Sequence, residues 1–302
     1  MHVPVMRADV VELLAPERGG VYVDCTVGLG GHARAILEAG ASRLVGLDRD
    51  AEALDAAGEA LAAWGDRVEL VHGDYRGLAS MLDSRALGAI DGVVADLGVS
   101  SLQLDAGGRG FSFQRDEPLD MRFDRSAGQT AAEFLAEVDE ADLADVVFRL
   151  GEERFSRRVA RAVVAHRARA PIRTTGELAA IVRRVVPRGR RGRIDPATRT
   201  FQALRIRVND ELDGLGDFVS AAAGRLRAGG RIVIISFHSL EDRVVKHTLR
   251  GLASAGAVID LTRRPRRAGH DEVAANPRAR SAKLRAAERA AGPGQAGGRG
   301  EP

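Results

Sequence analysis

The stretch DCTVGLGGHARAILEAG (Asp24–Gly40) constrains the fold more than any other part of this 302-residue chain. The apolar run Val21–Asp24 predicts a short buried strand, and the residues from His32 onward favour a helix. A glycine-rich turn lies between them, where the missing side chains let the backbone approach a ligand. A strand, a glycine turn and a helix in this order are typical of nucleotide-like cofactor sites in α/β proteins.

The same alternation continues along the chain. Further strands are predicted at Ser42–Asp50, Arg67–Tyr75 and Ile90–Ser101, and Ala51–Trp64 has helical spacing. Short apolar runs that alternate with helical stretches indicate a parallel sheet with crossover helices. We therefore predict the α/β class, with a Rossmann-like sheet.

The pattern changes after this point. The segment Leu102–Arg125 is loop-like, and two capping boxes follow at Thr130–Glu133 and Thr174–Glu177. Helices are predicted at Phe155–Arg169 and Leu178–Val186, with a bent or broken amphipathic helix from residue 135 to 150. This block holds no strand candidate, so we interpret it as a helical insertion for substrate recognition.

The sheet pattern then resumes. We predict a helical stretch at Phe201–Leu226, a buried strand within Ala228–Ser239, a helix at Leu240–Gly251, and a closing strand pair at Val258–Thr262 and Ser281–Arg289. The predicted domains are residues 1–109 and 199–290 for the two parts of the core, 110–198 for the insertion and 291–302 for a disordered tail.

Composition narrows the class of protein. There is one cysteine, Cys25, and no apolar run of membrane-spanning length or secretory signal pattern, so we expect a cytoplasmic protein without a membrane partner. Residues 1–150 hold 13 basic and 27 acidic residues, whereas residues 151–302 hold 32 basic and 15 acidic ones. This segregation favours a polyanionic partner.

The glycine turn fits two cofactors. The segment Gly28-Leu-Gly30-Gly31-His32-Ala33 matches the dinucleotide fingerprint G-x-G-x-x-G/A, with Asp48 twenty residues on from Gly28 for a ribose hydroxyl. The same geometry also serves S-adenosylmethionine. Asp24 decides between them, because its carboxylate suits an ammonium and a sulfonium and would repel a pyrophosphate. The remaining signals agree: Tyr75 offers stacking for an adenine, and Asp96 ends the fourth strand near the transferred methyl group.

The methyl acceptor is best interpreted as an exocyclic amine. Methylation of cytosine C5 needs a cysteine nucleophile, and Cys25 lies inside the cofactor turn. Ribose methylation usually uses a lysine base, and Lys246 and Lys283 are the only lysines. An amine needs a hydrogen-bond acceptor for its N–H, and Asp96 or the Leu97 carbonyl would supply one.

Basic and aromatic residues predict contacts with RNA. The candidates for stacking on a base are Phe111 and Phe113, with core packing as the alternative, and the candidates for phosphate contacts are Arg109, Arg122, Arg190, Arg191 and Arg193. Residues 263–267 (RRPRR) are a further phosphate-contact stretch.

Ten motifs together resemble one known family. They are HVPVM, GLGGH, LDRD, DLGVSS with a following QLD, RGFSF, PLDMR, GEERF, ATRTFQALRI, ISFHSLEDR and NPRARS, and they run in order from His2 to about Arg289. The chain resembles the RsmH (MraW) family of bacterial 16S rRNA methyltransferases, which modify cytidine N4 in the decoding centre.

The resemblance implies a class I methyltransferase fold with an inserted helical domain, and an assembled small subunit as substrate. The cofactor-binding positions that it implies are Gly30, Gly31, His32, Asp48, Tyr75, Asp96 and Gln103. Two positions depart from the family pattern: Tyr75 stands where many relatives have phenylalanine, and Leu102 stands where proline is common. The oligomeric state is left open, with a homodimer among the options.

The segment ISFHSLEDR ends a central strand, where such sheets bind ligands. Ser236, His238 and Glu241 are therefore candidate active-site residues, with His238 as a candidate catalytic residue beside Asp96. The alternative is that Ser239 caps the next helix, with Asp242 in its first turn. His and Cys residues never approach the spacing of metal ligands, so no metal site is predicted.

Three other functions remain open. A DNA amino-methyltransferase usually has a Pro-Pro-aromatic tetrapeptide after the fourth strand, where this chain has Asp96-Leu97-Gly98-Val99. A non-catalytic RNA-binding assembly factor would keep the cofactor fold without methyl transfer. A dinucleotide oxidoreductase would need a proton-relay group near a nicotinamide, and none is evident.

Overall fold

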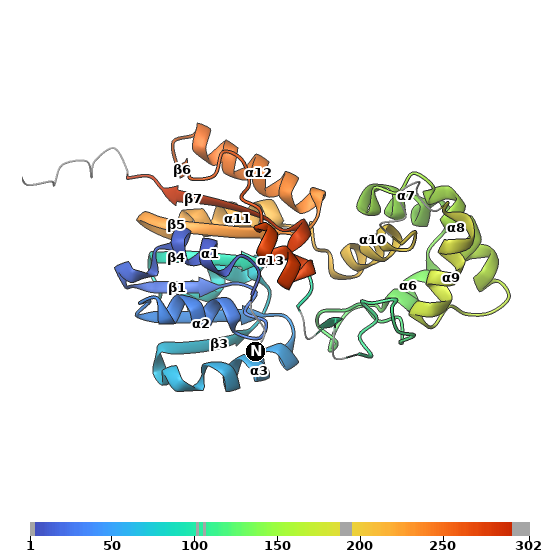
Figure 1. The fold of residues 1–302 in the computed structure, drawn as a ribbon, viewed down its shortest axis with the longest axis horizontal. Coiled ribbons are helices and arrows are strands. Elements are labelled where there is room, and N and C mark those ends of the chain that lie inside the picture. The colour runs from blue at the N-terminus through green and yellow to red at the C-terminus, as the bar shows by residue number, and fades with distance from the viewer. Residues whose placement is uncertain (1–3, 101–102, 105–106, 188–194, 292–302) are drawn as a thin grey trace, which may run out of the picture. The chain divides into compact units, whose positions relative to one another are not determined.

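The computed structural model describes residues 4–100, 103–104, 107–187 and 195–291 (Figure 1). The chain divides into two compact units. The first, here called the sheet unit, consists of Met1–Gly98 and Leu212–Pro302, and the second, the helical unit, is Val99–Glu211.

In the described part of the sheet unit, seven strands form one sheet in the order β3-β2-β1-β4-β5-β7-β6. The strands are β1 (Val21–Asp24), β2 (Arg43–Asp48), β3 (Val68–His72), β4 (Ile90–Asp96), β5 (Leu226–Ser236), β6 (Val258–Asp260) and β7 (Lys283–Arg289). The first five are parallel, and β7 is antiparallel to both β5 and β6. The predicted α/β class, parallel sheet and closing strand pair are confirmed.

Helices cover both faces of this sheet (Figure 1). One face packs against α1 (Arg7–Leu14), α2 (Gly31–Glu38) and α3 (Ala51–Leu61), with α13 (His270–Ala275) beside them. The other face packs against α4 (Leu78–Ser84), α11 (Leu215–Arg225) and α12 (Ser239–Ser254). Because both faces are covered, the central strands contain continuous apolar runs, as β5 illustrates with Ile232–Ile235 fully buried.

The helical unit packs its own apolar core. Its helices are α6 (Ala131–Glu137), α7 (Glu140–Gly151), α8 (Ser156–Arg167), α9 (Thr175–Val185) and α10 (Thr198–Asn209). The two predicted capping boxes are confirmed, since Thr130 and Glu133 cap α6 reciprocally and Thr174 and Glu177 cap α9. The predicted break in the helix between residues 135 and 150 lies between α6 and α7.

The continuous helical stretch predicted at Phe201–Leu226 is wrong. Asp210 and Gly214 have left-handed backbone conformations, with φ of 49° and 68°, and these separate α10 from α11. α10 then packs against α7 in the helical unit. The unit is consequently wider than the insertion predicted at 110–198.

Two further observations concern the remaining expectations. The tail predicted at 291–302 lies outside the described residues, apart from residue 291. No helix in the described ranges is long and apolar enough to cross a bilayer.

Candidate active site

The carboxyl ends of β1, β2 and β4 lie together at one edge of the sheet. β1 and β4 are neighbours in the middle of the sheet. The strands β2 and β3 follow on one side of β1, and β5 follows on the other side of β4, so the topological switch point of the sheet lies between β1 and β4. Three predicted residues end these strands: Asp24 on β1, Asp48 on β2 and Asp96 on β4. The fold thus brings together carboxylates that are up to 72 residues apart in sequence.

The glycine turn follows β1 directly. Gly30 has a φ of 79°, and a Cβ there would meet the Leu61 side chain at 3.2 Å. A Cβ on Gly31 would meet the Pro4 ring at 3.1 Å. The Gly28 N–H donates to Asp48 Oδ2 at 2.8 Å, which ties the turn to the end of β2. The glycine-rich turn predicted from the sequence is therefore present, and its backbone lies so close to Leu61 and Pro4 that a larger residue would displace them.

Asp24 is a buried carboxyl group with an unused oxygen. Its exposed fraction is 1 %, Oδ1 accepts the Thr26 N–H at 3.2 Å, and the buried Oδ2 has no hydrogen-bond partner in the structure. Burial raises the pKa of Asp24 to about 7, although His32 and the Thr26 N–H act in the opposite direction. An orphaned buried acceptor of this kind is suited to a cationic ligand group.

His32 and Asp96 form a second pair at the same edge. His32 Nε2 lies 3.5 Å from Asp96 Oδ2, and both ring nitrogens and Asp96 Oδ1 are buried without hydrogen-bond partners in the structure. Burial acts to lower the pKa of His32, but Asp96 and Asp24 together outweigh it, so the pKa lies above its ordinary value. Asp96 is half-buried, which leaves its carboxylate within reach of a ligand.

Sequence reasoning missed Thr26. Its hydroxyl accepts the Asp96 N–H at 2.7 Å, and its own N–H donates to Asp24. This residue therefore joins the ends of β1 and β4. The signal that would have found it is its position two residues after a strand-ending aspartate, which is typical of an Asx turn.

Asp48 and Asp50 have separate roles. Asp48 accepts the N–H groups of Gly28 and Asp50, one on each oxygen, and burial raises its pKa. A carboxylate has about four lone-pair sites, so acceptor capacity for ribose hydroxyls remains. Asp50 is the N-cap of α3, and its side chain accepts the Glu52 N–H at 3.2 Å.

Tyr75 lies in a short 3-10 helix after β3, and its ring packs against Phe218 with centroids 4.6 Å apart. The adjoining Asp74 is bound by Arg76 through two hydrogen bonds and by Arg49 at 3.2 Å. The Tyr75 ring thus has a packing role, and the stacking on adenine predicted for it stays a prediction.

Cys25 is fully buried, and its burial raises the pKa of the thiol. A thiol held in its neutral form is a poor nucleophile. This agrees with the argument against a covalent cysteine mechanism.

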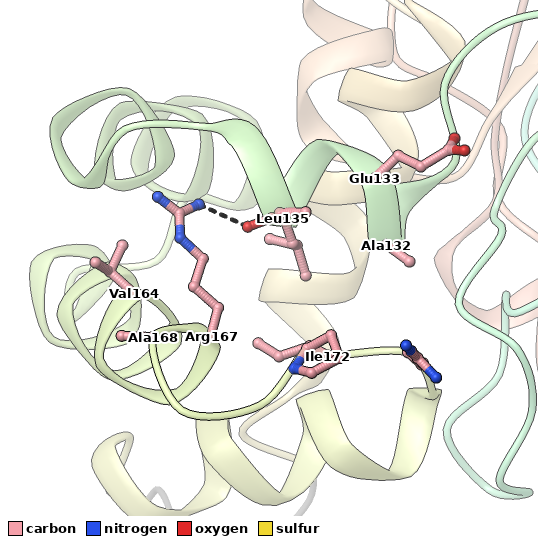
Figure 2. Close-up of a pocket in the computed structure, with 10 residues that line it drawn as sticks. Ala132, Glu133, Leu135, Val164, Arg167, Ala168 and Ile172 are labelled. Atoms are coloured by element: carbon pink, nitrogen blue, oxygen red, sulfur yellow. Dashed lines mark hydrogen bonds between the residues drawn. The ribbon is translucent and has the colours of Figure 1, made fainter.

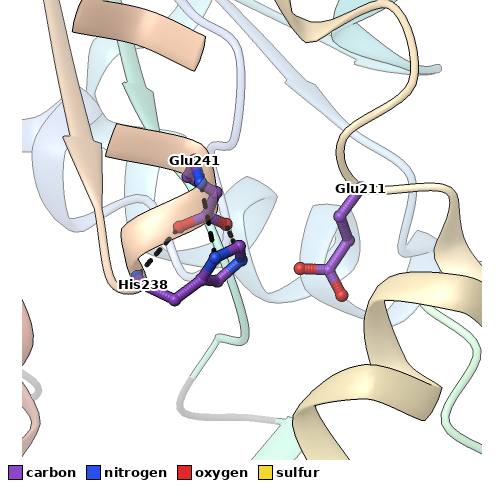
Figure 3. A group of neighbouring side chains, drawn as sticks. All are labelled: Glu211, His238 and Glu241. Carbon is purple, nitrogen blue, oxygen red and sulfur yellow. Dashed lines mark hydrogen bonds and ion pairs between the residues drawn. The ribbon is translucent and has the colours of Figure 1, made fainter. Parts of the chain in front are cut away.

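His238 caps a helix (Figure 3). It is the N-cap of α12: its Nδ1 accepts the Glu241 N–H at 3.4 Å, and Glu241 Oε2 accepts the N–H groups of Phe237 and His238. The alternative cap predicted at Ser239 is therefore wrong, because α12 begins one residue earlier than that role requires. The Ser236 hydroxyl donates to the Lys283 carbonyl of β7 at 3.3 Å, which is a sheet contact.

Asp242 pairs with two basic residues of β7. Arg285 and Lys283 lie at 2.7 and 3.0 Å from its oxygens and lower its pKa against the effect of burial. The Asp242 side chain thus attaches the first turn of α12 to β7. The catalytic role predicted for His238 stays a prediction.

Two arginines predicted to contact RNA have structural roles in the helical unit. Arg109 is only 2 % exposed, and its guanidinium donates to the carbonyls of Arg122 and Phe123. Arg122 binds both oxygens of Asp120, at 2.7 and 3.0 Å. Burial and these two bonds to Nη2 favour a structural role for Arg109, and the phosphate contact predicted for it stays a prediction.

The two predicted stacking residues are half-buried and packed on other rings. Phe111 stacks on Phe123 with centroids 5.6 Å apart, and Phe113 meets Phe201 of α10 edge-on at 4.8 Å. These contacts favour the core-packing alternative. Gln103 is buried and exchanges hydrogen bonds with Ser100. Arg190, Arg191 and Arg193 lie outside the described residues.

A pocket of about 500 Å³ lies between α6 and α8 in the helical unit (Figure 2). Its lining includes Leu135, Val164 and Ile172, and the Arg167 guanidinium donates to the Leu135 carbonyl at 2.6 Å. The lining is mainly apolar and holds no cluster of convergent acids like that at the switch point. The sequence did not predict this pocket.

Comparison with known proteins decides the family. The model of the MraW methylase family matches residues 1–290. The chain belongs to this family. It is 51 % identical to Ribosomal RNA small subunit methyltransferase H of Bradyrhizobium diazoefficiens, over 97 % of this chain and 92 % of that protein. It is 49 % identical to the proteins of the same name from Geotalea uraniireducens (95 % and 98 % covered) and Deinococcus radiodurans (97 % and 91 % covered).

The fold and cofactor follow from this membership. A seven-stranded sheet with β7 antiparallel between β5 and β6 is the class I methyltransferase fold, and S-adenosylmethionine is the methyl donor. The site fits that donor, because it offers an orphaned carboxylate oxygen at Asp24 and, across the glycine turn, a second carboxylate at Asp48.

Proposed function

We propose that this protein transfers a methyl group from S-adenosylmethionine to the exocyclic N4 of cytosine 1402 of 16S rRNA, in the decoding centre of the small ribosomal subunit. The family and the names of the relatives support a methyltransferase of small-subunit rRNA. One observation carries the choice of an amine: Asp96 ends β4 at the switch point with a buried, unpaired Oδ1. With a ribosomal substrate, we expect the protein to act in the cytoplasm.

The chemistry asks for an acceptor rather than a nucleophile. The lone pair of a cytosine amine is delocalised into the ring, and it becomes available as the nitrogen pyramidalises. Asp96 would accept an N–H hydrogen bond from this nitrogen and then its proton, as the new N–C bond forms and the C–S bond of the donor breaks. Positioning the amine in line with the transferred group supplies much of the remaining rate enhancement.

Other residues at this edge would hold the donor. Asp24 would face its cationic groups, the backbone of Gly30 and Gly31 would lie against its amino-acid part, and Asp48 would accept ribose hydroxyls. Tyr75 and Gln103 are further proposed contacts, on the family resemblance. S-adenosylmethionine supplies the electrophilic methyl group when bound.

The test is methyl transfer from labelled S-adenosylmethionine to small subunits that lack the modification, and separately to their purified RNA. Digestion to nucleosides then identifies the product. The proposal predicts N4-methylcytidine in subunits, at one position. A different methylated nucleoside would overturn the proposed acceptor, and cofactor binding with no transfer to either substrate would favour a non-catalytic assembly factor.

Asp96→Asn provides the sharpest variant for this assay. The amide keeps the shape of the side chain but cannot take a proton, so we expect transfer to fall at least ~100-fold, the scale of a lost general base. Its folding is checked by thermal unfolding. Asp83→Asn is the matched control, because Asp83 lies on α4 in an exposed pair with Arg225 and should leave transfer unchanged. A folded Asp96→Asn variant with near-normal turnover would remove Asp96 from the mechanism.

A further inference from the structure

Asp24, His32 and Asp96 form a buried cluster whose hydrogen-bonding capacity is largely unused. His32 is 5 % exposed and Asp24 is 1 % exposed. Four polar atoms of the cluster are buried without a hydrogen-bond partner in the structure: Asp24 Oδ2, both ring nitrogens of His32 and Asp96 Oδ1. The His32–Asp96 contact of 3.5 Å is an ion-pair distance and too long for a good hydrogen bond. Such a cluster is costly unless its charges balance.

The charges around His32 come from several elements. Asp24 of β1 and Asp96 of β4 stabilise its protonated form, whereas Arg7 of α1 and burial oppose it. Asp48 of β2 adds negative charge next to Asp24. Without a ligand, Asp24 retains part of its proton at neutral pH because its pKa is about 7, and a protonated His32 offsets the charge of Asp96.

The methyl donor brings its own cations to this place. S-adenosylmethionine carries an ammonium, a sulfonium and a carboxylate, and Asp24 is the residue suited to its cationic groups. Once these cations face Asp24 and Asp96, a positive charge on His32 is opposed by like charge in a site with little solvent. The product S-adenosylhomocysteine has a neutral thioether in place of the sulfonium, so this opposition is weaker in the product complex.

We propose that binding of S-adenosylmethionine expels a proton from His32, and that the proton released by the methylated amine refills the cluster through Asp96. The balance is complete. One proton leaves when the sulfonium arrives, and one N–H proton moves to Asp96 and then to His32 Nε2 as the sulfonium becomes a thioether. His32 is in this sense a positioning residue that holds a proton for Asp96. The proton release on binding rests on the cofactor site alone, whereas the refilling step rests on the proposed amine acceptor.

The experiment is calorimetric titration of the whole protein, without RNA, in two buffers that differ in ionisation enthalpy near pH 7. The difference in apparent heat gives the number of protons released per ligand. We expect about one proton for S-adenosylmethionine and less than half of that for S-adenosylhomocysteine, because linkage follows the change in bound protons. Adenosine, which lacks both cations, should release none.

The variant His32→Gln tests whether the released proton comes from His32. It should release fewer protons than the wild type on binding S-adenosylmethionine, with the remainder coming from Asp24, whereas His270→Gln, at an exposed histidine that begins α13, should match the wild type. Equal release by wild type and His32→Gln would overturn the assignment to His32. Heats that do not depend on the buffer would overturn the proposal as a whole.

A measurement on the wild type alone covers the case in which His32→Gln does not fold. Because the two ligands differ by more than half a proton, the preference for S-adenosylmethionine over S-adenosylhomocysteine should rise at least about threefold per pH unit between the bound and free pKa of the cluster. A preference that is constant from pH 6 to pH 9 would contradict the proposal.

Discussion

Asp24 shows at the scale of one residue how a binding function costs stability. Its carboxyl group is fully buried at the end of β1, where an apolar residue would pack without cost. Burial raises its pKa to about 7, so the free protein resists its ionisation at neutral pH. The unused Oδ2 is what a cationic ligand would satisfy.

Asp24→Asn should therefore stabilise the free protein at alkaline pH. A folded-state pKa above the unfolded value means that the folded state binds more protons between about pH 4 and pH 7, so stability falls as pH rises through this window. Above pH 7 the variant should gain on the order of 3 kcal/mol, since it has no charge to bury and its Oδ1 still accepts the Thr26 N–H. Urea unfolding at pH 5 and pH 8 measures this.

The same substitution should weaken binding of S-adenosylmethionine at pH 8, because the opposing charge is gone. Asp55→Asn on the outer side of α3 is the control for both measurements, since Asp55 is exposed. An Asp24→Asn variant that is less stable than wild type at pH 8 would contradict the account of its burial.

Two glycines in one loop have nearly the same φ, and comparing them distinguishes the cost of a left-handed backbone from the cost of a steric clash. Gly110 and Gly128 have φ of 76° and 78° in the loop before α6. A Cβ on Gly110 would lie 2.6 Å from the Pro118 carbonyl oxygen and 2.7 Å from the Asp120 nitrogen, whereas a Cβ on Gly128 would meet nothing within 4 Å. The loop around Gly110 is thus folded back on itself.

We expect Gly128→Ala to cost about 1 kcal/mol, the usual penalty for a left-handed residue with a Cβ. Gly110→Ala should cost at least about twice as much, because backbone atoms must also move. Chemical denaturation of both variants tests the difference. Equal costs would show that the Pro118–Asp120 segment yields easily.

The start of α12 is the element that decides what His238 does. Asn is among the best N-cap residues, so His238→Asn should keep the cap, while His238→Ala should lose about 1 kcal/mol of stability. If the role of His238 is to cap α12, His238→Asn will retain methyl transfer. A folded His238→Asn variant with transfer reduced ~100-fold would instead establish the predicted catalytic role.

Acidic and basic residues are segregated along the sequence but nearly balanced within each of the two units. The sheet unit holds 24 basic and 25 acidic residues, and the helical unit holds 21 basic and 17 acidic ones. The strong split at residue 150 falls inside the helical unit, between the acidic α7 and the basic α8. On α8, Arg157 and Arg161 are exposed on one face, the latter with 78 % of its side chain accessible.

These arginines yield a prediction about binding of the proposed RNA substrate. Phosphate contacts release counterions, so the double variant Arg157→Gln/Arg161→Gln should bind small-subunit RNA more weakly and reduce the slope of log K against log salt by roughly 1.5 to 2. Filter binding at several salt concentrations measures the slope. The matched control is Arg18→Gln/Arg250→Gln, two exposed arginines of the sheet unit. An unchanged slope would exclude α8 from the RNA-binding surface.

The local chemistry of this chain was readable from its sequence. Strands, the glycine turn and the capping boxes depend on neighbours within a few residues, so Asp24 and Asp96 were correctly predicted to end strands, whereas β2 ends at Asp48, two residues before the predicted end. Handedness and adjacency of parallel strands limit the possible strand orders, and the structure selects among them. Asp24, Tyr75 and Asp96 favoured S-adenosylmethionine over a dinucleotide, and the family motifs agreed with that choice.

Tertiary contacts decided the rest. The left-handed Asp210 divides a stretch with continuous helical character, and Asn209 beside it holds the Phe123 N–H at 2.7 Å across 86 residues. The sequence predicts that Arg109 contacts a phosphate, but folding buries its guanidinium against two main-chain carbonyls. The Thr26 hydroxyl accepts the Asp96 N–H only because folding places β4 beside β1. An arginine, an aromatic ring or a hydroxyl has the same local pattern whether it binds a ligand or the protein itself, and only the partners that folding brings from far along the chain distinguish the two.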